Sequence, residues 1–120
     1  MAAKSNILIT GGAGFIGLAL AKYLSDRSYK VIIFDNLSRG KFDNKFKEIL
    51  KKRNVSFFKV DLKKKIRIRL KNLSHIFHLA GSVGVKNINR DSYGSFLNNI
   101  ITLKNVIEMS KPFQRHAKLI

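Results

Sequence analysis

Three evenly spaced glycines constrain the fold of this chain more than any other feature. Gly11, Gly14 and Gly17 lie in the segment TGGAGFIG, between a short apolar run, Asn6–Thr10 (NILIT), and a stretch at residues 15–25 with apolar side chains at helical spacing. At a strand-to-helix junction, the first glycine permits a tight turn, the second lets a pyrophosphate approach the backbone, and the third lets the helix pack closely. The helix N-terminus attracts the phosphate charge. The segment therefore predicts a dinucleotide-binding turn, with an ordinary strand-to-helix turn as the alternative.

An acidic residue stands where such a turn needs one. Asp35 ends the second apolar run, Lys30–Asp35 (KVIIFD), 18 residues after Gly17. A carboxylate there accepts hydrogen bonds from both hydroxyls of an adenosine ribose and repels a 2′-phosphate, which favours NAD over NADP. Arg39 in the next loop is able to pair with such a phosphate, so NADP stays open. The alternative for Asp35 is a cap of the turn after the strand.

The rest of the chain alternates short apolar runs with longer helical patterns. This order is typical of an α/β fold, here a Rossmann-type doubly wound parallel sheet with helices on both faces. Further strands are predicted at residues 55–60, 75–80 and 117–120, and further helices at residues 44–53 and 93–110, before Pro112. We expect the sheet to be truncated at its fifth strand.

The segment at residues 63–71 (KKKIRIRLK) fits two structures. Its apolar residues Ile66, Ile68 and Leu70 alternate with basic ones, and a period of two indicates an edge strand. Parallel strands, however, need a crossover connection, which is usually a helix. We therefore expect a short helix here.

Composition narrows the class of protein. The 120 residues contain no cysteine, which excludes a disulfide scaffold, a zinc-thiolate site and a cysteine nucleophile. The length fits one domain, and no apolar run approaches the roughly 20 residues of a membrane span. The N-terminus has no leader-peptide pattern. We expect a cytoplasmic protein with no membrane partner.

The charge of the chain is far from balanced, at +17. Thirteen of the 24 basic residues lie between Lys41 and Lys71, among three acidic ones. A basic stretch is a feature of nucleic-acid binding, but no zinc-finger spacing, RNA-binding aromatic cluster or recognition helix accompanies it. We therefore do not expect nucleic acid as the main partner. The positive surface is suited to attract a phosphorylated or nucleotide-linked substrate.

Four segments, TGGAGFIG, FDNLSRG, VDL and HLAG, occur in an order and at intervals that resemble a known family. They are similar to those of the extended short-chain dehydrogenase/reductases, in the branch of NAD-dependent epimerases and dehydratases that act on nucleotide sugars and that includes UDP-glucose 4-epimerase. GSVGVK and NNIITLKNVIE resemble the segments that follow HLAG in these enzymes. The likeness extends over nearly the whole chain. It implies NAD as the cofactor and residues 1–120 as an NAD-binding Rossmann domain.

The resemblance implies cofactor-binding roles for fourteen residues. The pyrophosphate would lie against Gly11, Gly14, Phe15, Ile16 and Gly17, the adenosine ribose against Asp35, Asn36 and Ser38, the adenine ring against Asp61 and Leu62, the nicotinamide-side ribose and phosphates against Leu79, Ala80 and Gly81, and the last position is Asn99 on the helix. Asn98 is the alternative to Asn99, which is nearly as well explained as a solvated helix side chain. Asp61 has the alternative of a helix N-cap. We expect His78 to pack in the sheet rather than act as a base.

The catalytic residues of the family have no counterpart in this sequence. The family catalyses with a Tyr-x-x-x-Lys pair on the helix after the fifth strand and a Ser or Thr at the end of that strand, whereas the fourth residues after the three tyrosines are Arg27, Ile33 and Leu97. We therefore assign no catalytic and no metal-ligating residue. On this interpretation the chain is the NAD-binding N-terminal portion of a nucleotide-sugar epimerase or dehydratase, without its substrate domain. A nucleotide sugar would bind only when a C-terminal part completes the protein.

Two other functions stay open: a stand-alone NAD-binding or regulatory module, and a basic nucleic-acid-binding protein. A sheet that stops at the fifth strand also has an exposed edge, with the apolar strand at residues 75–80 close to it. Such an edge is able to pair with another chain. It therefore offers a route to self-association.

Overall fold

The computed structural model describes residues 5–39, 42–81 and 90–120. Gly40 and Lys41 of the loop after the second predicted strand, and most of the segment GSVGVK, lie outside these residues. The strands are β1 (Asn6–Thr10), β2 (Lys30–Asp35), β3 (Val55–Lys59), β4 (Leu73–His78) and β5 (Lys118–Leu119). The helices are α1 (Phe15–Asp26), α2 (Asn44–Leu50) and α4 (Ser92–Ser110), and the short 3-10 helix η1 (Lys111–Phe113) follows α4.

The five strands form one parallel sheet in the order β3-β2-β1-β4-β5. Leu8 of β1 lies opposite Ile32 of β2 on one side and Ile76 of β4 on the other. The register between β1 and β4 shifts between Asn6 and Ile7. Because the chain moves outward from β1 through β2 and β3 and then returns to the other side of β1, the strand order confirms the predicted doubly wound α/β fold.

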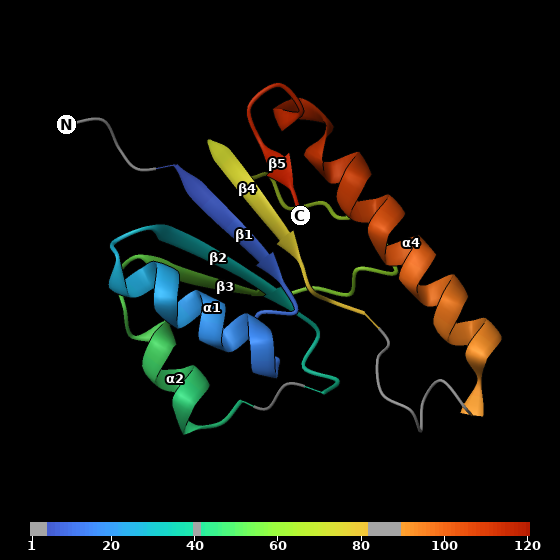
Figure 1. The fold of residues 1–120 in the computed structure, drawn as a ribbon, viewed down its shortest axis with the longest axis horizontal. Coiled ribbons are helices and arrows are strands. Elements are labelled where there is room, and N and C mark those ends of the chain that lie inside the picture. Colours follow the sequence, from blue (N-terminus) through green and yellow to red (C-terminus); the bar gives the residue numbers. More distant parts are fainter. Residues whose placement is uncertain (1–4, 40–41, 82–89) are drawn as a thin grey trace.

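Alternation along the central strands divides the core between the two faces of the sheet. Ile7 and Ile9 of β1 pack with side chains of α1 and α2 on one face. Leu8 packs with Leu62 and with Val106 of α4 on the other face. Figure 1 shows α1 and α2 together beside β2 and β3, and α4 apart from them beside β4 and β5. Both faces of β1 are therefore covered, which explains its continuous apolar sequence.

The predicted boundaries agree closely with the structure in the centre of the sheet and less closely around it. β1 and β2 begin and end where the sequence predicts. α2 ends at Leu50 rather than at residue 53, and β4 lies two residues earlier than predicted. At its C-terminal end β4 stops before Ala80, because the Ala80 amide bonds to the side-chain oxygen of Thr10 and not to the backbone of β1.

The helix predicted at residues 63–71 is wrong. The chain forms a turn after Asp61 and then runs outside any helix or strand to β4. Ile66, Ile68 and Leu70 are half-buried against the core on the α4 face, and the basic residues between them are exposed. The period of two therefore indicated an extended backbone correctly. A crossover has only to span the sheet, and extended chain advances about 3.3 Å per residue against 1.5 Å for a helix.

β5 separates β4 from the edge of the sheet. His75 lies opposite Lys118 and Ile76 opposite Leu119. Ile120 adds two hydrogen bonds of 2.8 Å, one from His78 N to its oxygen and one from its nitrogen to Ile76 O. The edge on this side is therefore that of β5 and not that of the apolar β4.

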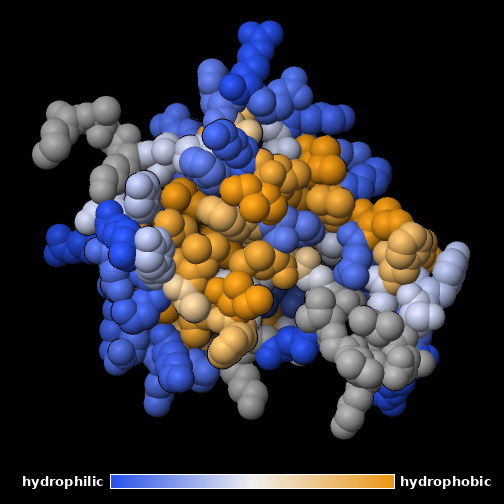
Figure 2. Space-filling view, in the orientation of Figure 1, coloured by the Kyte–Doolittle hydropathy of each residue, from blue (hydrophilic) through white to orange (hydrophobic). Residues whose placement is uncertain are grey.

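Apolar side chains are also found on the surface. Figure 2 shows hydrophobic residues gathered at the centre of one face of the molecule, with hydrophilic residues around them. Seven exposed large apolar side chains belong to α4, and we call them the outer face of α4: Tyr93, Phe96, Leu97, Ile100, Ile101, Leu103 and Ile107. Across residues 5–39, 42–81 and 90–120, no helix is long and apolar enough to cross a membrane.

Candidate functional site

A cleft of about 660 Å³ opens at the C-terminal ends of the central strands. It lies where the direction of winding reverses, because α1 follows β1 on one face of the sheet and α4 follows β4 on the other. Open α/β sheets bind their ligands at this switch point. The position alone therefore makes the cleft the candidate site.

The cleft brings all the sequence-predicted residues together. Its lining contains Gly11, Gly14, Phe15, Ile16, Gly17, Asp35, Asn36, Ser38, Asp61, Leu62, Leu79, Ala80, Gly81 and Asn99. Five more residues complete it: Arg39, Val60, Lys63, Asn98 and Thr102. Asn98 and Asn99 both line the cleft, so the lining does not distinguish between these two alternatives. Thr102 could have been found from the helix pattern, because it lies four residues after Asn98 and three after Asn99.

Two of the three evenly spaced glycines are required by the fold itself. Gly11 has a φ of +71°, and a Cβ on it would lie 2.8 Å from the amide nitrogen of Ala80. A Cβ on Gly17 would overlap the carbonyl oxygen of Gly11. Gly14 differs, because among the described residues a Cβ there would approach only that oxygen, at 3.3 Å. The space beside Gly14 therefore belongs to the cleft rather than to the core.

The N-terminus of α1 lacks the capping side chain that α2 and α4 have. Asp43 accepts a hydrogen bond of 3.0 Å from Phe46 N at the start of α2, and Asp91 accepts one of 2.8 Å from Gly94 N at the start of α4. α1 follows Gly14, which has no side chain, and carries no acidic residue in its first turn. The first amides of α1 are thus left to a ligand, and the helix dipole favours an anion there.

Asp35 joins the glycine turn to the loop after β2. Its buried carboxylate accepts hydrogen bonds from Ala13 N at 3.0 Å and from Leu37 N at 2.7 Å. An ionised carboxylate has about four lone-pair positions, so about two stay available to a ligand. Asn36 Oδ1 accepts a bond of 2.9 Å from Ser38 N and shapes the same loop. Asp35 therefore caps the turn, as the alternative predicts, and it also lines the cleft.

The turn after β3 forms one wall of the cleft. Asp61 accepts hydrogen bonds from Lys63 N with its carboxylate, at 3.0 Å, and from Lys64 N with its carbonyl oxygen, at 3.1 Å. No helix begins between Asp61 and β4, so the alternative of a helix N-cap for Asp61 is wrong. Leu62 is 5% exposed and offers the cleft a small apolar surface. We call residues 61–64 the Asp61 turn.

The end of β4 lies between the glycine turn and α4. Leu79 N donates to Thr10 O at 3.1 Å, and Ala80 N donates to Thr10 Oγ1 at 3.2 Å. Gly81 then approaches α4 so closely that a Cβ on it would lie 3.1 Å from Asn99 Oδ1. These residues therefore connect the glycine turn with α4, on two sides of the cleft.

His78 packs at the same junction and does not line the cleft. Its Nδ1 lies 2.7 Å from Thr10 Oγ1, and burial lowers the pKa of His78 below the usual 6.5. Because the Thr10 oxygen already accepts the Ala80 amide, its proton is available to Nδ1, and we assign the ring proton to Nε2. This arrangement agrees with the expectation that His78 packs in the sheet.

The lining suits an anionic ligand with hydroxyl groups and a flat apolar part. Free helix amides favour phosphate, the carboxylates of Asp35 and Asp61 are acceptors for hydroxyl or amino groups, and Leu62 supplies apolar contact. Arg39 and Lys63 add positive charge to the lining. Within the described parts of the chain, no three His, Asp or Glu side chains are grouped as a metal ion would need.

The sequence matches that of a large group of known proteins. The family model described as the NAD dependent epimerase/dehydratase family matches residues 7–120. A putative UDP-glucose 4-epimerase of Methanocaldococcus jannaschii is 33% identical over 111 residues, which cover 89% of this chain and 34% of that protein.

Two solved structures are similar to this chain in fold as well as in sequence. The UDP-glucose 4-epimerase of Thermus thermophilus, solved as a complex with NAD, superposes with a TM-score of 0.72 at 30% identity, over 91% of this chain and 34% of that one. The UDP-glucose 4-epimerase of Thermotoga maritima, solved with UDP-glucose, gives a TM-score of 0.69 at 33% identity, over 88% of this chain and 33% of that one. The chain spans about a third of the length of each of these relatives.

Proposed function

Because this chain belongs to the NAD dependent epimerase/dehydratase family, we propose that its residues form the NAD-binding portion of an enzyme that acts on a nucleotide sugar. The observation that carries the proposal is the cleft at the switch point, where an uncapped helix N-terminus and the carboxylate of Asp35 lie in one lining. A dinucleotide needs both features, since it combines a pyrophosphate with a ribose. The Thermus thermophilus relative with NAD supports the choice of cofactor.

Different residues of the lining would bind different parts of the dinucleotide. The amides at the start of α1 would bind the pyrophosphate, and the open space at Gly14 would let it approach. Asp35 would accept hydrogen bonds from the adenosine ribose, and the Asp61 turn would lie along the adenine ring. Residues 79–81 and Asn99 would hold the nicotinamide-side ribose and phosphate. NAD supplies, when bound, a nicotinamide ring that takes a hydride from a sugar carbon and returns it.

The remaining parts of the proposal concern the whole protein. We infer that the whole protein binds a nucleotide sugar, since residues 1–120 span about a third of the length of relatives named for such substrates. The Thermotoga maritima relative with UDP-glucose supports this class of substrate. We also propose a cytoplasmic location and self-association through the free edge of the sheet at β5.

Calorimetric titration of the 120-residue chain with NAD, at physiological salt, tests the cofactor assignment. The Asp35→Asn variant should bind NAD about tenfold more weakly, because one carboxylate hydrogen bond to the ribose is worth about 1.5 kcal/mol. The preference for NAD over NADP should also fall, because the charge that repels a 2′-phosphate is gone.

Asp43→Asn is the matched control for Asp35→Asn. It removes one negative charge from a turn-capping carboxylate at the start of α2, which does not line the cleft. Its NAD affinity should equal that of the unsubstituted chain. Equal effects of the two substitutions would mean that NAD responds to the charge of the chain alone, and the proposed site would then be wrong.

A further inference from the structure

We propose that Asn105 is a positioning residue, which holds the Asp61 turn in place as a wall of the nucleotide cleft. The inference rests on the proposed function for the identity of the nucleotide. It concerns a residue that does not line the cleft itself. Asn105 acts instead through the backbone of the Asp61 turn, whose residues Asp61, Leu62 and Lys63 do line it.

The contacts of Asn105 point in one direction. Its side-chain nitrogen Nδ2 donates to the carbonyl oxygen of Leu62 at 2.7 Å and to that of Lys64 at 3.2 Å. Asn105 is 9% exposed, and the bond to Leu62 is buried. An Asn side chain has two N–H donors, and here both point to carbonyl oxygens of the Asp61 turn.

The turn needs such a support because the crossover has no helix. In a helix, the carbonyl oxygens of Leu62 and Lys64 would accept bonds from amides four residues later. The bonds within the Asp61 turn use the oxygens of Asp61 and the amides of Lys63 and Lys64. Among the described residues, Asn105 is the donor to both carbonyl oxygens, and its bond to that of Leu62 is the buried one. A buried carbonyl without a donor would be costly.

α4 connects this support to the rest of the site. Asn98, Thr102 and Asn105 are spaced by four and three residues, so they lie along one face of the helix. Asn98 and Thr102 line the cleft, and Asn105 lies one turn farther along. Val106, beside it, is fully buried and packs in the same core cluster as Leu62. Asn105 thus fixes the distance between the α4 wall and the Asp61 wall.

Asn54 offers a matched control for Asn105. Its Nδ2 also donates to two backbone carbonyl oxygens, those of Ser25 at 2.9 Å and Tyr29 at 2.8 Å. It precedes β3, at the opposite end of the sheet from the cleft. Asn105→Leu and Asn54→Leu therefore remove the same chemical group from two places. Both variants should unfold at a lower temperature than the unsubstituted chain.

Two measurements on these variants test the proposal, at a temperature at which both variants are folded. In Asn105→Leu, the amide exchange rates of Lys63 and Lys64 measured by NMR should rise about tenfold, and NAD should bind about tenfold more weakly, the value of one lost hydrogen bond to a carbonyl. In Asn54→Leu, neither quantity should change. If the two variants agree in both quantities, Asn105 has a structural role only and the proposal is overturned.

Asn105→Ser keeps the proposal testable if Asn105→Leu does not fold. Its shorter hydroxyl has one donor in place of two, so its effects should lie between those of the unsubstituted chain and Asn105→Leu. An effect on thermal stability without an effect on amide exchange or NAD affinity would overturn the proposal. If the unsubstituted chain does not bind NAD, the proposed function fails, and amide exchange in the Asp61 turn then decides by itself whether Asn105 holds it.

Discussion

Single residues of the cleft hold the fold together as well as line the site. The Asp35 carboxylate connects the glycine turn through Ala13 with the next loop through Leu37. At the neighbouring strand end, Leu79 and Ala80 of the lining connect β4 with β1 through Thr10. A substitution at such a position changes stability and binding together. The sharpest tests therefore use residues at which the two effects separate.

Gly14 and Gly17 are such a pair. Gly14→Ala should lower the free energy of unfolding much less than Gly17→Ala does, because the new Cβ would lie 3.3 Å from Gly11 O and would not overlap it. It should weaken NAD binding at least about tenfold, since the methyl group takes space that a pyrophosphate needs. Gly17→Ala should cost about 1–3 kcal/mol of stability through overpacking against the Gly11 carbonyl. Denaturant unfolding and calorimetric titration of both variants measure the two effects.

The opposite pattern would contradict this division of roles. A strongly destabilised Gly14→Ala variant would mean that the fold needs glycine at both positions. Full NAD affinity in Gly14→Ala would place the pyrophosphate away from the turn.

His78 gives the stability of the chain a dependence on pH. Burial lowers the pKa of His78 in the folded chain below the 6.5 of the unfolded one. As the pH falls below 6.5, the unfolded state therefore takes up the proton first, and stability declines until the folded-state pKa is reached. Above pH 6.5 His78 is neutral in both states and contributes no slope.

His78→Gln should reduce the slope of stability against pH below 6.5, as measured by denaturant unfolding at a series of pH values. The other histidines are present in both proteins, so the difference reports His78 alone. Asp26, whose pKa is lowered to about 2 by hydrogen bonds from Lys22 and Lys52, acts in a separate and more acidic range. Equal slopes in the two proteins would show that His78 is as accessible when folded as when unfolded.

At the scale of elements, the crossover from β3 to β4 shows where sequence reasoning succeeds and fails. β1 and β2 were predictable because strands buried on both faces have continuous apolar sequences. The structure of the crossover was not predictable in this way. Parallel strands are usually joined by a helix, but the connection only has to span the sheet, and an extended chain does so equally well. Ile66, Ile68 and Leu70 carried the correct signal in their period of two.

This alternation predicts unequal effects of neighbouring substitutions. Ile68→Asn should lower the free energy of unfolding by about 1–2 kcal/mol, because Ile68 packs against the core on the α4 face. Arg67→Asn should change it by less than about 0.5 kcal/mol, because Arg67 is exposed. Denaturant unfolding of both variants measures the difference. Similar effects at the two positions would mean that the crossover does not pack as described.

The candidate site was predictable to a greater extent than the elements around it. Glycines and carboxylates at strand ends have a chemical reason to be there, so Gly11 and Asp35 could be chosen from the residues alone, whereas the role of Asp61 was implied by the resemblance to the family. Asn105 could not be chosen in this way, because its role depends on which carbonyl oxygens the fold brings to it. The available signal was its spacing of three residues from Thr102 and seven from Asn98, which places the three polar side chains along one face of the helix.

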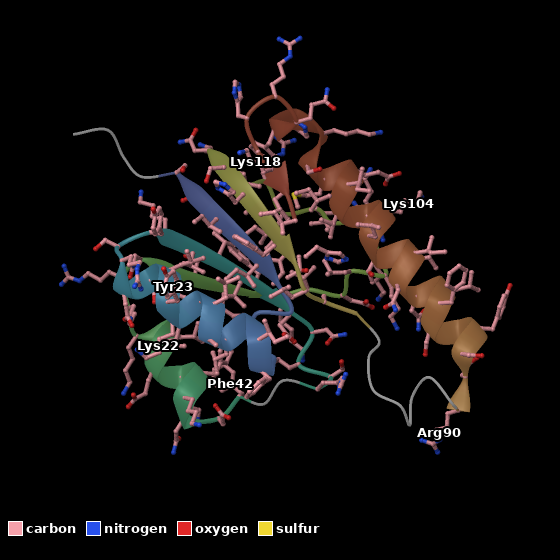
Figure 3. The ribbon with its side chains drawn as sticks, in the orientation of Figure 1. Lys22, Tyr23, Phe42, Arg90, Lys104 and Lys118 are labelled. Carbon is pink, nitrogen blue, oxygen red and sulfur yellow. The ribbon has the colours of Figure 1, made fainter. Side chains whose placement is uncertain are left out.

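At the scale of the whole molecule, the net charge disfavours association between copies, whereas the exposed apolar surface favours it. The outer face of α4 carries seven exposed large apolar side chains, with Lys104 and Glu108 among them as an ion pair of 3.5 Å. The net charge of +17 repels a second copy. Lys118 lies on β5 and places one of these positive charges at the edge of the sheet (Figure 3).

Self-association through the β5 edge should therefore increase with salt, which screens the repulsion between copies. Both the nitrogen and the oxygen of Ile120 bond to β4, so the backbone groups of Leu119 point to the free edge. Leu119→Pro removes the donor there and should reduce association. Sedimentation velocity at low and at high salt measures this.

Ile107→Lys is the control for Leu119→Pro, because it places a charge on the outer face of α4 and leaves the edge intact. It should associate as the unsubstituted chain does. If Ile107→Lys prevents association and Leu119→Pro does not, copies meet through α4 and the edge proposal is wrong.

The extended crossover also limits how this connection can change in length. Every second side chain from Ile66 to Leu70 faces the core, so an insertion or deletion of one residue there would bury cations and expose isoleucines. A change of two residues would restore the pattern. Relatives that share this connection should therefore differ in length there by even numbers.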